Sequence, residues 1–421
     1  TTLLVPDTSG ALAHVVLGLG KGDDPWSTGG LAKSLPKGRY RIAETHGASD
    51  AFATWAALAW ALGAYQFTRY KKDGAAAAEK LAHLCWPDQA DRAYVSRAVA
   101  AAILTRDLIN TPAADMGPLQ IETIAREIAE AHGASVKVTV GDQLLEEGYP
   151  AVHAVGRAAA SHRAPRIIEI GWNLERSELP LVTLVGKGVV FDSGGLDIKP
   201  ASGMRQMKKD MGGAAHALAL GRMVMQAGLM VRLVVLVPAV ENAISGDAFR
   251  PGDILQSRKG LTIEVGNTDA EGRLILADAL ARAAEHGPDL TIDFATLTGA
   301  ARVALGPELP PLYTTDDRLA DEILDASRSV SDPVWRMPLW AGYREAIDSE
   351  LADVRNDSAD WAQAGSVTAA LFLQRFAPET GSWAHFDIFA WNPRGRPGWP
   401  AGGEAQAIRA VYAVLKSRYG G

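Results

Sequence analysis

The feature that most constrains the fold is the alternation of strand-like and helix-like segments between residues 166 and 389. This alternation is typical of an α/β sheet covered by helices. In open sheets of this kind, ligand sites gather at the carboxyl ends of the strands. Helices are expected at 212–226 and 272–286. The strands are expected at 166–171, 179–191, 230–239, 261–265, 290–295 and 383–389.

The first part of the chain has a different, Ala-rich pattern, with a strand expected at 11–19 and a long apolar helix at 49–70. A connecting helix is expected at 91–108 and another helix at 118–132. A chain of 421 residues, 48% of them hydrophobic, is long enough for two domains. We therefore predict an α/β protein with a smaller N-terminal α/β domain, 1–90, and a larger C-terminal domain, 91–421. The larger domain includes the connecting helix and has a central mixed sheet flanked by helices.

The octapeptide NTDAEGRL at 267–274 carries the strongest chemical signal in the chain. Asp269, Glu271 and Arg273 occupy alternate positions, and alternate side chains of an extended segment point the same way. We therefore expect them to converge at the end of the strand at 261–265. Two acids can hold hard cations, and an arginine can hold a small anion or a polarised oxygen. The pattern indicates a metal-dependent hydrolase.

Further candidate ligands lie about sixty residues upstream. Lys187 ends an apolar run, Asp192 follows in FDSGG, Lys199 comes next, and Asp210 opens DMGGAA where a helix is expected to begin. With Asp269 and Glu271 this makes four carboxylates, which suit two divalent cations. A neutral lysine amine is also a ligand if metal and burial lower its pKa. A lone lysine in a turn, however, is more often a solvated charge.

The motifs VGKG, FDSGG, IKP, DMGGAA and NTDAEGRL, in that order, resemble the leucyl (cytosol) aminopeptidase family, the M17 metallopeptidases. The resemblance covers roughly residues 90–420 and is most specific over 185–300. The Pro/Gly-rich segment at 394–403 is similar to a divergent bacterial branch. The resemblance implies that the larger domain is catalytic. It would remove N-terminal residues from peptides with a water or hydroxide bridging two divalent metal ions.

The resemblance also implies which residues hold the metals. Asp192, Asp269 and Glu271 would bind the more exchangeable ion. Lys187, Asp192, Asp210 and Glu271 would bind the other, so that Asp192 and Glu271 bridge. Mn²⁺ and Zn²⁺ are the expected ions, and oxygen ligands with one amine also suit Co²⁺.

Roles in catalysis and substrate binding follow from the same resemblance. Lys199 would stabilise the oxyanion, and Arg273 would hold a bicarbonate ion that acts as general base. The pocket for the first residue would be apolar and would favour Leu or Met, although Met207 on its own is as well explained by core packing. The pocket residues would be Met207, Thr296, Leu297 and Gly299.

Composition limits the partners. The net charge of −7, from 42 basic and 49 acidic residues, argues against nucleic-acid binding. The single cysteine fits a reducing compartment, and neither a membrane span nor a signal peptide is evident, so we expect a cytoplasmic protein. The family resemblance implies a homohexamer acting on peptides with a free N terminus.

Two other functions remain open at this point. The same two-metal site could act on a phosphoester or a non-peptide amide, because four carboxylates do not choose the substrate by themselves. The chain could also be a regulatory or DNA-binding protein on an aminopeptidase fold. Lys187 and Lys199 in register with the acidic motifs favour the peptidase, and the acidic net charge disfavours DNA binding.

Overall fold

The structure is a computed structural model that describes residues 1–22, 24–43, 51–74, 76, 79–358 and 363–420. The chain divides into two compact units. The first comprises residues 1–103 and 392–402, and the second comprises 104–391 and 403–421. Strands and helices occur in both units, and the second contains a large mixed sheet, so the predicted two-domain α/β fold is confirmed. The domain division at residues 90 and 91 stays a prediction.

The first unit is built from short strands around a small apolar core. β1 pairs with β2 in an antiparallel hairpin, and β3 pairs with β4 in parallel. The predicted strand at 11–19 is β2, and the predicted helix at 49–70 is the shorter α2; residues 49 and 50 lie outside the described residues. The core of this first unit comprises Leu31, Ala32, Leu35, Trp60 and Ala82. The elements are β1 (Thr2–Pro6), β2 (Leu12–Leu17), α1 (Leu31–Ser34), β3 (Arg39–Tyr40), α2 (Phe52–Ala64) and β4 (His83–Leu84).

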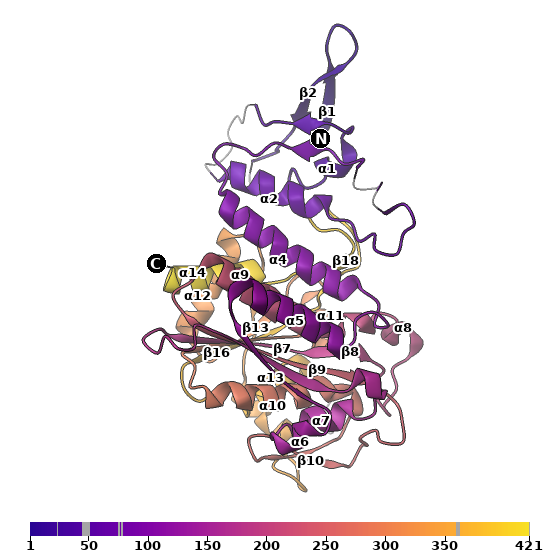
Figure 1. The fold of residues 1–421 in the computed structure, drawn as a ribbon, viewed down its shortest axis with the longest axis vertical. Helices are drawn as coiled ribbons and strands as arrows, with labels where there is room; N and C mark the ends of the chain where they lie inside the picture. The colour runs from indigo at the N-terminus through magenta and orange to yellow at the C-terminus, as the bar shows by residue number, and fades with distance from the viewer. Residues whose placement is uncertain (23, 44–50, 75, 77–78, 359–362, 421) are drawn as a thin grey trace. The chain divides into compact units, whose positions relative to one another are not determined.

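In the described part of the second unit, nine strands form one sheet, which lies in the lower half of Figure 1. The order is β14-β13-β16-β12-β7-β9-β6-β5, with β8 also paired to β9. Strands β16, β12, β7 and β9 run parallel, whereas β13, β6 and β5 add antiparallel pairs. The strands are β5 (Ser135–Val140), β6 (Arg166–Trp172), β7 (Leu181–Gly186), β8 (Gly188–Asp192), β9 (Arg232–Asn242), β12 (Leu290–Ala295), β13 (Pro311–Tyr313), β14 (Trp335–Arg336) and β16 (Ser382–Asp387).

Helices cover both faces of this sheet (Figure 1). α5 and α9 pack on one face, and α14 packs against α9; α7 (Pro150–Gly156) and α10 pack on the other face, with α13 against α10. α5 shows why the helix bounds could be predicted, since Pro118 opens it and Gly133 ends it with a left-handed φ of 65°. The longer helices are α4 (Arg92–Asn110), α5 (Pro118–His132), α9 (Gly212–Ala227), α10 (Glu271–Glu285), α12 (Asp317–Ser329), α13 (Gly365–Gln374) and α14 (Ile408–Tyr419).

The predicted strand at 179–191 is in fact two strands, β7 and β8, separated by Lys187. Both pair with β9. At the break, the N–H of Lys187 donates to the carbonyl of Phe294 (3.0 Å), and its carbonyl accepts from the N–H of Ala214 (2.8 Å). These bonds attach the break to the end of β12 and the start of α9. A continuous apolar pattern could not reveal the interruption.

The predicted strand at 261–265 is β11 (Thr262–Glu264), but it does not belong to the large sheet. It forms a three-stranded sheet with β10 (Ile254–Gln256) and β15 (Val354–Arg355). The expectation that both ligand motifs follow strands of one sheet is therefore wrong for the octapeptide. The remaining short elements are α6 (Gln143–Glu146), η1 (Ser161–Arg163), α8 (Ala201–Met204), η2 (Met207–Met211), η3 (Thr268–Ala270), α11 (Gly299–Leu305), η4 (Ala341–Ile347), β17 (Trp391–Asn392) and β18 (Gly402–Gly403).

A buried ion pair joins the two ends of the second unit. Arg106 in α4 and Glu404, near the start of α14, are 1% and 2% exposed. The guanidinium donates to both carboxylate oxygens at 3.0–3.1 Å, although the residues are 298 positions apart in sequence. A buried charge is tolerated when it is paired and hydrogen-bonded. Each residue therefore depends on the other for its place in the core.

Candidate active site

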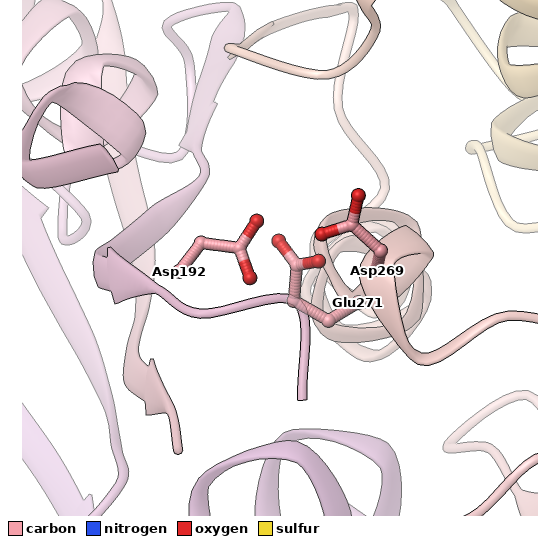
Figure 2. A group of neighbouring side chains, drawn as sticks. All are labelled: Asp192, Asp269 and Glu271. Atoms are coloured by element: carbon pink, nitrogen blue, oxygen red, sulfur yellow. The ribbon is translucent and has the colours of Figure 1, made fainter. Parts of the chain in front are cut away.

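Three carboxyl groups from two separate parts of the chain meet at one point, as Figure 2 shows. Asp192 is the last residue of β8, Asp269 lies in η3, and Glu271 is the first residue of α10. One oxygen from each lies within 4.8 Å of the others. Asp192 and Glu271 are buried, and Asp269 is half-buried. Such a group of oxygens is suited to a divalent cation.

The local conformation that brings these acids together is not the predicted one. The octapeptide is not extended, because Asp269 sits in a 3₁₀ turn and Glu271 and Arg273 sit in the first turn of α10. The side chain of Asn267 caps the turn by accepting from the N–H of Asp269 (2.8 Å). Alternate positions therefore do not share one side here. The acids converge because the turn η3 is followed directly by the first turn of α10, and both lie beside the end of β8.

Lys187 extends from the break in the sheet into the same cluster. Its Nζ lies 2.8 Å from Asp210 Oδ2 and 3.0 Å from Glu271 Oε1, and it donates to the carbonyl of Thr296 (2.9 Å). Burial lowers the pKa of Lys187, but the surrounding carboxylates, Asp210 foremost, outweigh burial and raise the pKa above its usual range. Asp210, in η2 just before α9, has a lowered pKa because Lys187 outweighs the effect of burial. The solvated-charge interpretation of Lys187 is therefore wrong.

Lys199 lies on the other side of the cluster. Its Nζ is 2.8 Å from Asp192 Oδ2 and forms a second ion pair with Asp269. Burial lowers the pKa of Lys199, but Asp192 and the neighbouring acids outweigh it and raise the pKa. Lys199 is therefore a protonated group that faces the point where the carboxylates meet.

Several carboxylate oxygens of this cluster accept no hydrogen bond from the described residues. Burial, and then the charge of Asp192, raise the pKa of Asp269 to about 6 and the pKa of Glu271 well above its usual value. Asp210 Oδ2, Asp269 Oδ1 and both Glu271 oxygens have no hydrogen-bond partner among the described residues. Some of them are close to lysines, but the angles do not meet hydrogen-bond geometry, so we regard those contacts as charge pairs only. Buried carboxylates in this state fit divalent cations.

Two buried residues that sequence reasoning missed fix the orientation of these acids. Asn242, at the end of β9, donates to Asp192 Oδ1 (2.8 Å) and to the carbonyl of Thr268 (3.1 Å). Thr268 donates to the carbonyl of Gly194 (2.7 Å) and accepts from the N–H of Asp197 (2.8 Å). The FDSGG loop and the octapeptide are thereby held together. Nothing in the sequence around Asn242 distinguishes it from an ordinary strand residue.

Arg273 is buried and also borders the site. Its Nη1 donates to the carbonyl of Asn356 (2.6 Å), while its Nε has no partner among the residues that the structure describes. Burial lowers the pKa of Arg273 to about 10 against the opposing charges of Asp357 and Glu271. An unpartnered, buried guanidinium N–H fits a small anion.

A cavity of about 610 Å³ opens over these groups. Lys187, Asp192, Lys199, Asp210 and Asp269 line it, and Arg273 does so as well. The predicted pocket residues Met207, Thr296, Leu297 and Gly299 also line it. Thr296 additionally donates to Asp210 Oδ1 (2.8 Å), so it is part of the acid cluster as well as of the wall. The lining residues that sequence reasoning did not select include Lys209, Arg302 and Phe389.

Comparison with known proteins identifies the family. The catalytic-domain model of the cytosol aminopeptidase family matches residues 103–412, and the N-terminal-domain model of M17 aminopeptidases matches residues 1–87. A probable cytosol aminopeptidase of Roseiflexus castenholzii is 40% identical over 367 residues, which is 84% of this chain and 74% of the relative.

Solved structures agree. The cytosol aminopeptidase of Coxiella burnetii superposes with a TM-score of 0.94 and 49% identity, covering 100% of this chain and 89% of that one. A bottromycin maturation enzyme in complex with Mn superposes with a TM-score of 0.89 and 35% identity, covering 99% of this chain and 93% of that one. The comparisons give no support to the DNA-binding alternative.

The fold, the acid cluster and these matches define the protein as a hydrolase, a metal-dependent aminopeptidase. The chain belongs to the cytosol aminopeptidase family, the M17 peptidases. Among the described residues, no helix has both the length and the apolarity that crossing a membrane would require.

Proposed function

We propose that this site holds two divalent metal ions, Mn²⁺ or Zn²⁺, and that it removes the N-terminal residue of peptides. The observation that carries the proposal is the set of buried carboxylate oxygens without hydrogen-bond partners. Asp192, Asp210, Asp269 and Glu271 would hold the ions together with Lys187, whose amine would lose its proton when a cation replaces it as partner of the carboxylates. Glu271 approaches both the Lys187–Asp210 pair and the Asp192–Asp269 pair, which suits a bridging role for Glu271, and Asp192 would bridge with it.

Two divalent ions, when bound, would polarise the scissile carbonyl and make water more acidic. The chain supplies the remaining groups. Lys199 faces the acid cluster, and as an ammonium group it would donate to the oxygen on which negative charge develops. Arg273, with its unpartnered Nε, would hold a bicarbonate ion, whose chemistry is that of a general base.

Two divalent ions would offset the charge of the four carboxylates, and the free α-amine of a peptide would then be a ligand for one of them. An acetylated nitrogen is a poor ligand, which accounts for the expected requirement for a free N terminus. We propose that Met207, Thr296, Leu297 and Gly299 contact the first residue of the peptide, because they line the same cavity as the acids. Belonging to a peptidase family sets aside the phosphoester and non-peptide amide alternatives.

We also propose the cytoplasm as the location and a homohexamer as the assembly. Both follow from the family resemblance rather than from an interface. Sedimentation of the purified chain tests the assembly directly, because a hexamer is six times the mass of the 44.6 kDa chain. A fully active monomer would refute it.

The decisive experiment uses protein stripped with EDTA and reloaded with Mn²⁺ or Zn²⁺. We expect release of p-nitroaniline from Leu-p-nitroanilide only after reloading, and none from the N-acetylated substrate. The variant Lys199→Ala should lose kcat while retaining both ions, as measured by elemental analysis. Metal-independent cleavage, or cleavage of the acetylated substrate, would refute the proposal. Loss of metal from Lys199→Ala would show that its role is misassigned.

A further inference from the structure

Lys209 is a cation of the active-site cavity that has no acidic partner among the residues the structure describes. Lys209, the residue before Asp210 in η2, is only 5% exposed, yet its side chain lines the cavity. Its Nζ lies 4.8 Å from the centroid of the Phe389 ring and makes no hydrogen bond or ion pair with the described part of the chain. A buried ammonium group is costly when it is unpaired, and one aromatic face compensates only a part of that cost. A molecule bound in the cavity could therefore supply the acidic partner that the described residues do not give Lys209.

A second cation approaches the same ring. The guanidinium carbon of Arg302, in α11, lies 5.1 Å from the centroid of Phe389, and Arg302 also lines the cavity. The nearby acids are already engaged. Asp210 is paired with Lys187, and Asp387 accepts four hydrogen bonds from backbone and hydroxyl groups. The wall around Phe389 is therefore positively charged, in contrast to the acid cluster in the same cavity.

We infer that this basic wall, formed by Lys209, Arg302 and Phe389, binds a carboxylate of the peptide substrate. The inference rests on the proposed aminopeptidase function and specifies its preferred substrates. A carboxylate would give Lys209 the charge-assisted hydrogen bonds that it lacks, whereas a Leu or Met side chain would leave it unpaired. The expected Leu or Met preference thus conflicts with the chemistry of this wall.

A substrate can present that carboxylate in two ways. It is either the side chain of an N-terminal Asp or Glu, or the C-terminal carboxylate of a dipeptide. Two matched pairs of substrates separate these sources. Glu-p-nitroanilide against Gln-p-nitroanilide tests the side chain, and Leu-Ala against Leu-Ala-amide tests the C terminus. Within each pair the two members differ in charge and are nearly the same in shape.

The measurement is the ratio of kcat/KM within each pair for the Mn²⁺-loaded enzyme. We expect the wild type to favour the charged member of one pair about tenfold or more, the size of a charge-assisted hydrogen bond. Lys209→Met should abolish that preference while the neutral member keeps its kcat/KM within a few fold. Any effect of the substitution on the metals cancels in the ratio, because both members use the same site.

Lys208→Met is the matched control. This neighbouring lysine donates to the carbonyl of Asn110 (2.6 Å) and is not among the residues that line the cavity. Its loss should leave both ratios unchanged. Ratios near one in both pairs for the wild type, or a preference that survives Lys209→Met, would overturn the inference.

The proposed function can fail separately. If none of the four compounds is cleaved, the aminopeptidase assignment of the substrate is wrong, and the same compounds are then compared as ligands by titration calorimetry. Tighter binding of a charged member, lost in Lys209→Met, would uphold the carboxylate site. Equal affinities within both pairs would overturn it.

Discussion

The side chain of Lys187 passes so close to Gly272 that a β-carbon on Gly272 would lie 2.5 Å from Lys187 Cε and 2.7 Å from its Nζ. Gly272 is the second residue of α10, a position where alanine would otherwise favour the helix by about 1 kcal/mol. The glycine is therefore needed for the path of Lys187 into the acid cluster, not for the helix.

Gly272→Ala should consequently separate activity from stability. We expect at least a tenfold loss of kcat/KM, because Lys187 must leave Asp210 and Glu271, with little change in the melting temperature. Peptidase assays and thermal unfolding check this. Gly246→Ala is the control, since a β-carbon there meets nothing within 4 Å. A variant with wild-type activity would mean that the position of Lys187 is unimportant.

Asn242→Ala should weaken metal binding although Asn242 is not a proposed ligand. Its amide orients Asp192 and also reaches the carbonyl of Thr268. Loss of such a supporting hydrogen bond costs roughly 10- to 100-fold in metal affinity. Competition with a fluorescent chelator measures the affinity. An unchanged affinity would show that β8 alone fixes Asp192.

Glu271→Gln should raise the stability of the metal-free protein and remove its stabilisation by metal. The folded-state pKa of Glu271 is raised, by burial and by Asp192, so this carboxylate destabilises the metal-free protein increasingly as pH rises from its unfolded pKa of about 4.5. The amide avoids that cost. Denaturant unfolding of EDTA-treated protein at pH 5 and pH 8 should show a difference between variant and wild type at pH 8. Mn²⁺ should then stabilise only the wild type. A Glu271→Gln protein that Mn²⁺ still stabilises would contradict the bridging role.

His216 should make the protein sensitive to acid. Its Nδ1 bonds to the carbonyl of Gly212 (2.6 Å), and its Nε2 accepts from the N–H of Gln406 (2.9 Å), so the buried ring is neutral. Burial lowers the pKa of His216 from 6.5 to about 4. The unfolded chain binds the extra proton first, and stability should fall by roughly 3 kcal/mol between pH 6.5 and pH 4. Histidine NMR checks the cause: the His216 signals, assigned with His216→Gln, should not titrate between pH 7 and pH 5. A His216 titration near pH 6.5 would refute the prediction.

The sequence predicted the fold better than it predicted the local geometry of the candidate site. Helix signals such as Pro118 and Gly133 are local, and α5 was found at its predicted bounds. The octapeptide was assigned an extended conformation because alternate charged residues fit a period of two. The structure instead places Asp269 in a turn and Glu271 in a helix. The pattern of eight residues alone cannot distinguish this arrangement from an extended segment.

Residues that act through distant partners were beyond sequence analysis. Asn242 and Asp192 are fifty positions apart, and the residues around either of them do not indicate the hydrogen bond between the two side chains. Two consecutive lysines such as Lys208 and Lys209 are typical of a solvated surface, but Lys209 is buried and Lys208 is partly buried. A lysine beside an acidic ligand gives no sign in sequence of which way its side chain turns.

The pairing of Arg106 with Glu404 also bears on how the enzyme is made. Since 298 residues separate the two, this ion pair cannot form until the ribosome has added nearly all of the second unit. Because synthesis starts at the N terminus, all residues of the acid cluster, of which Glu271 is the last, are present before the ion pair between Arg106 and Glu404 can form. The nascent chain holds every proposed metal ligand while it is still an unfinished peptidase.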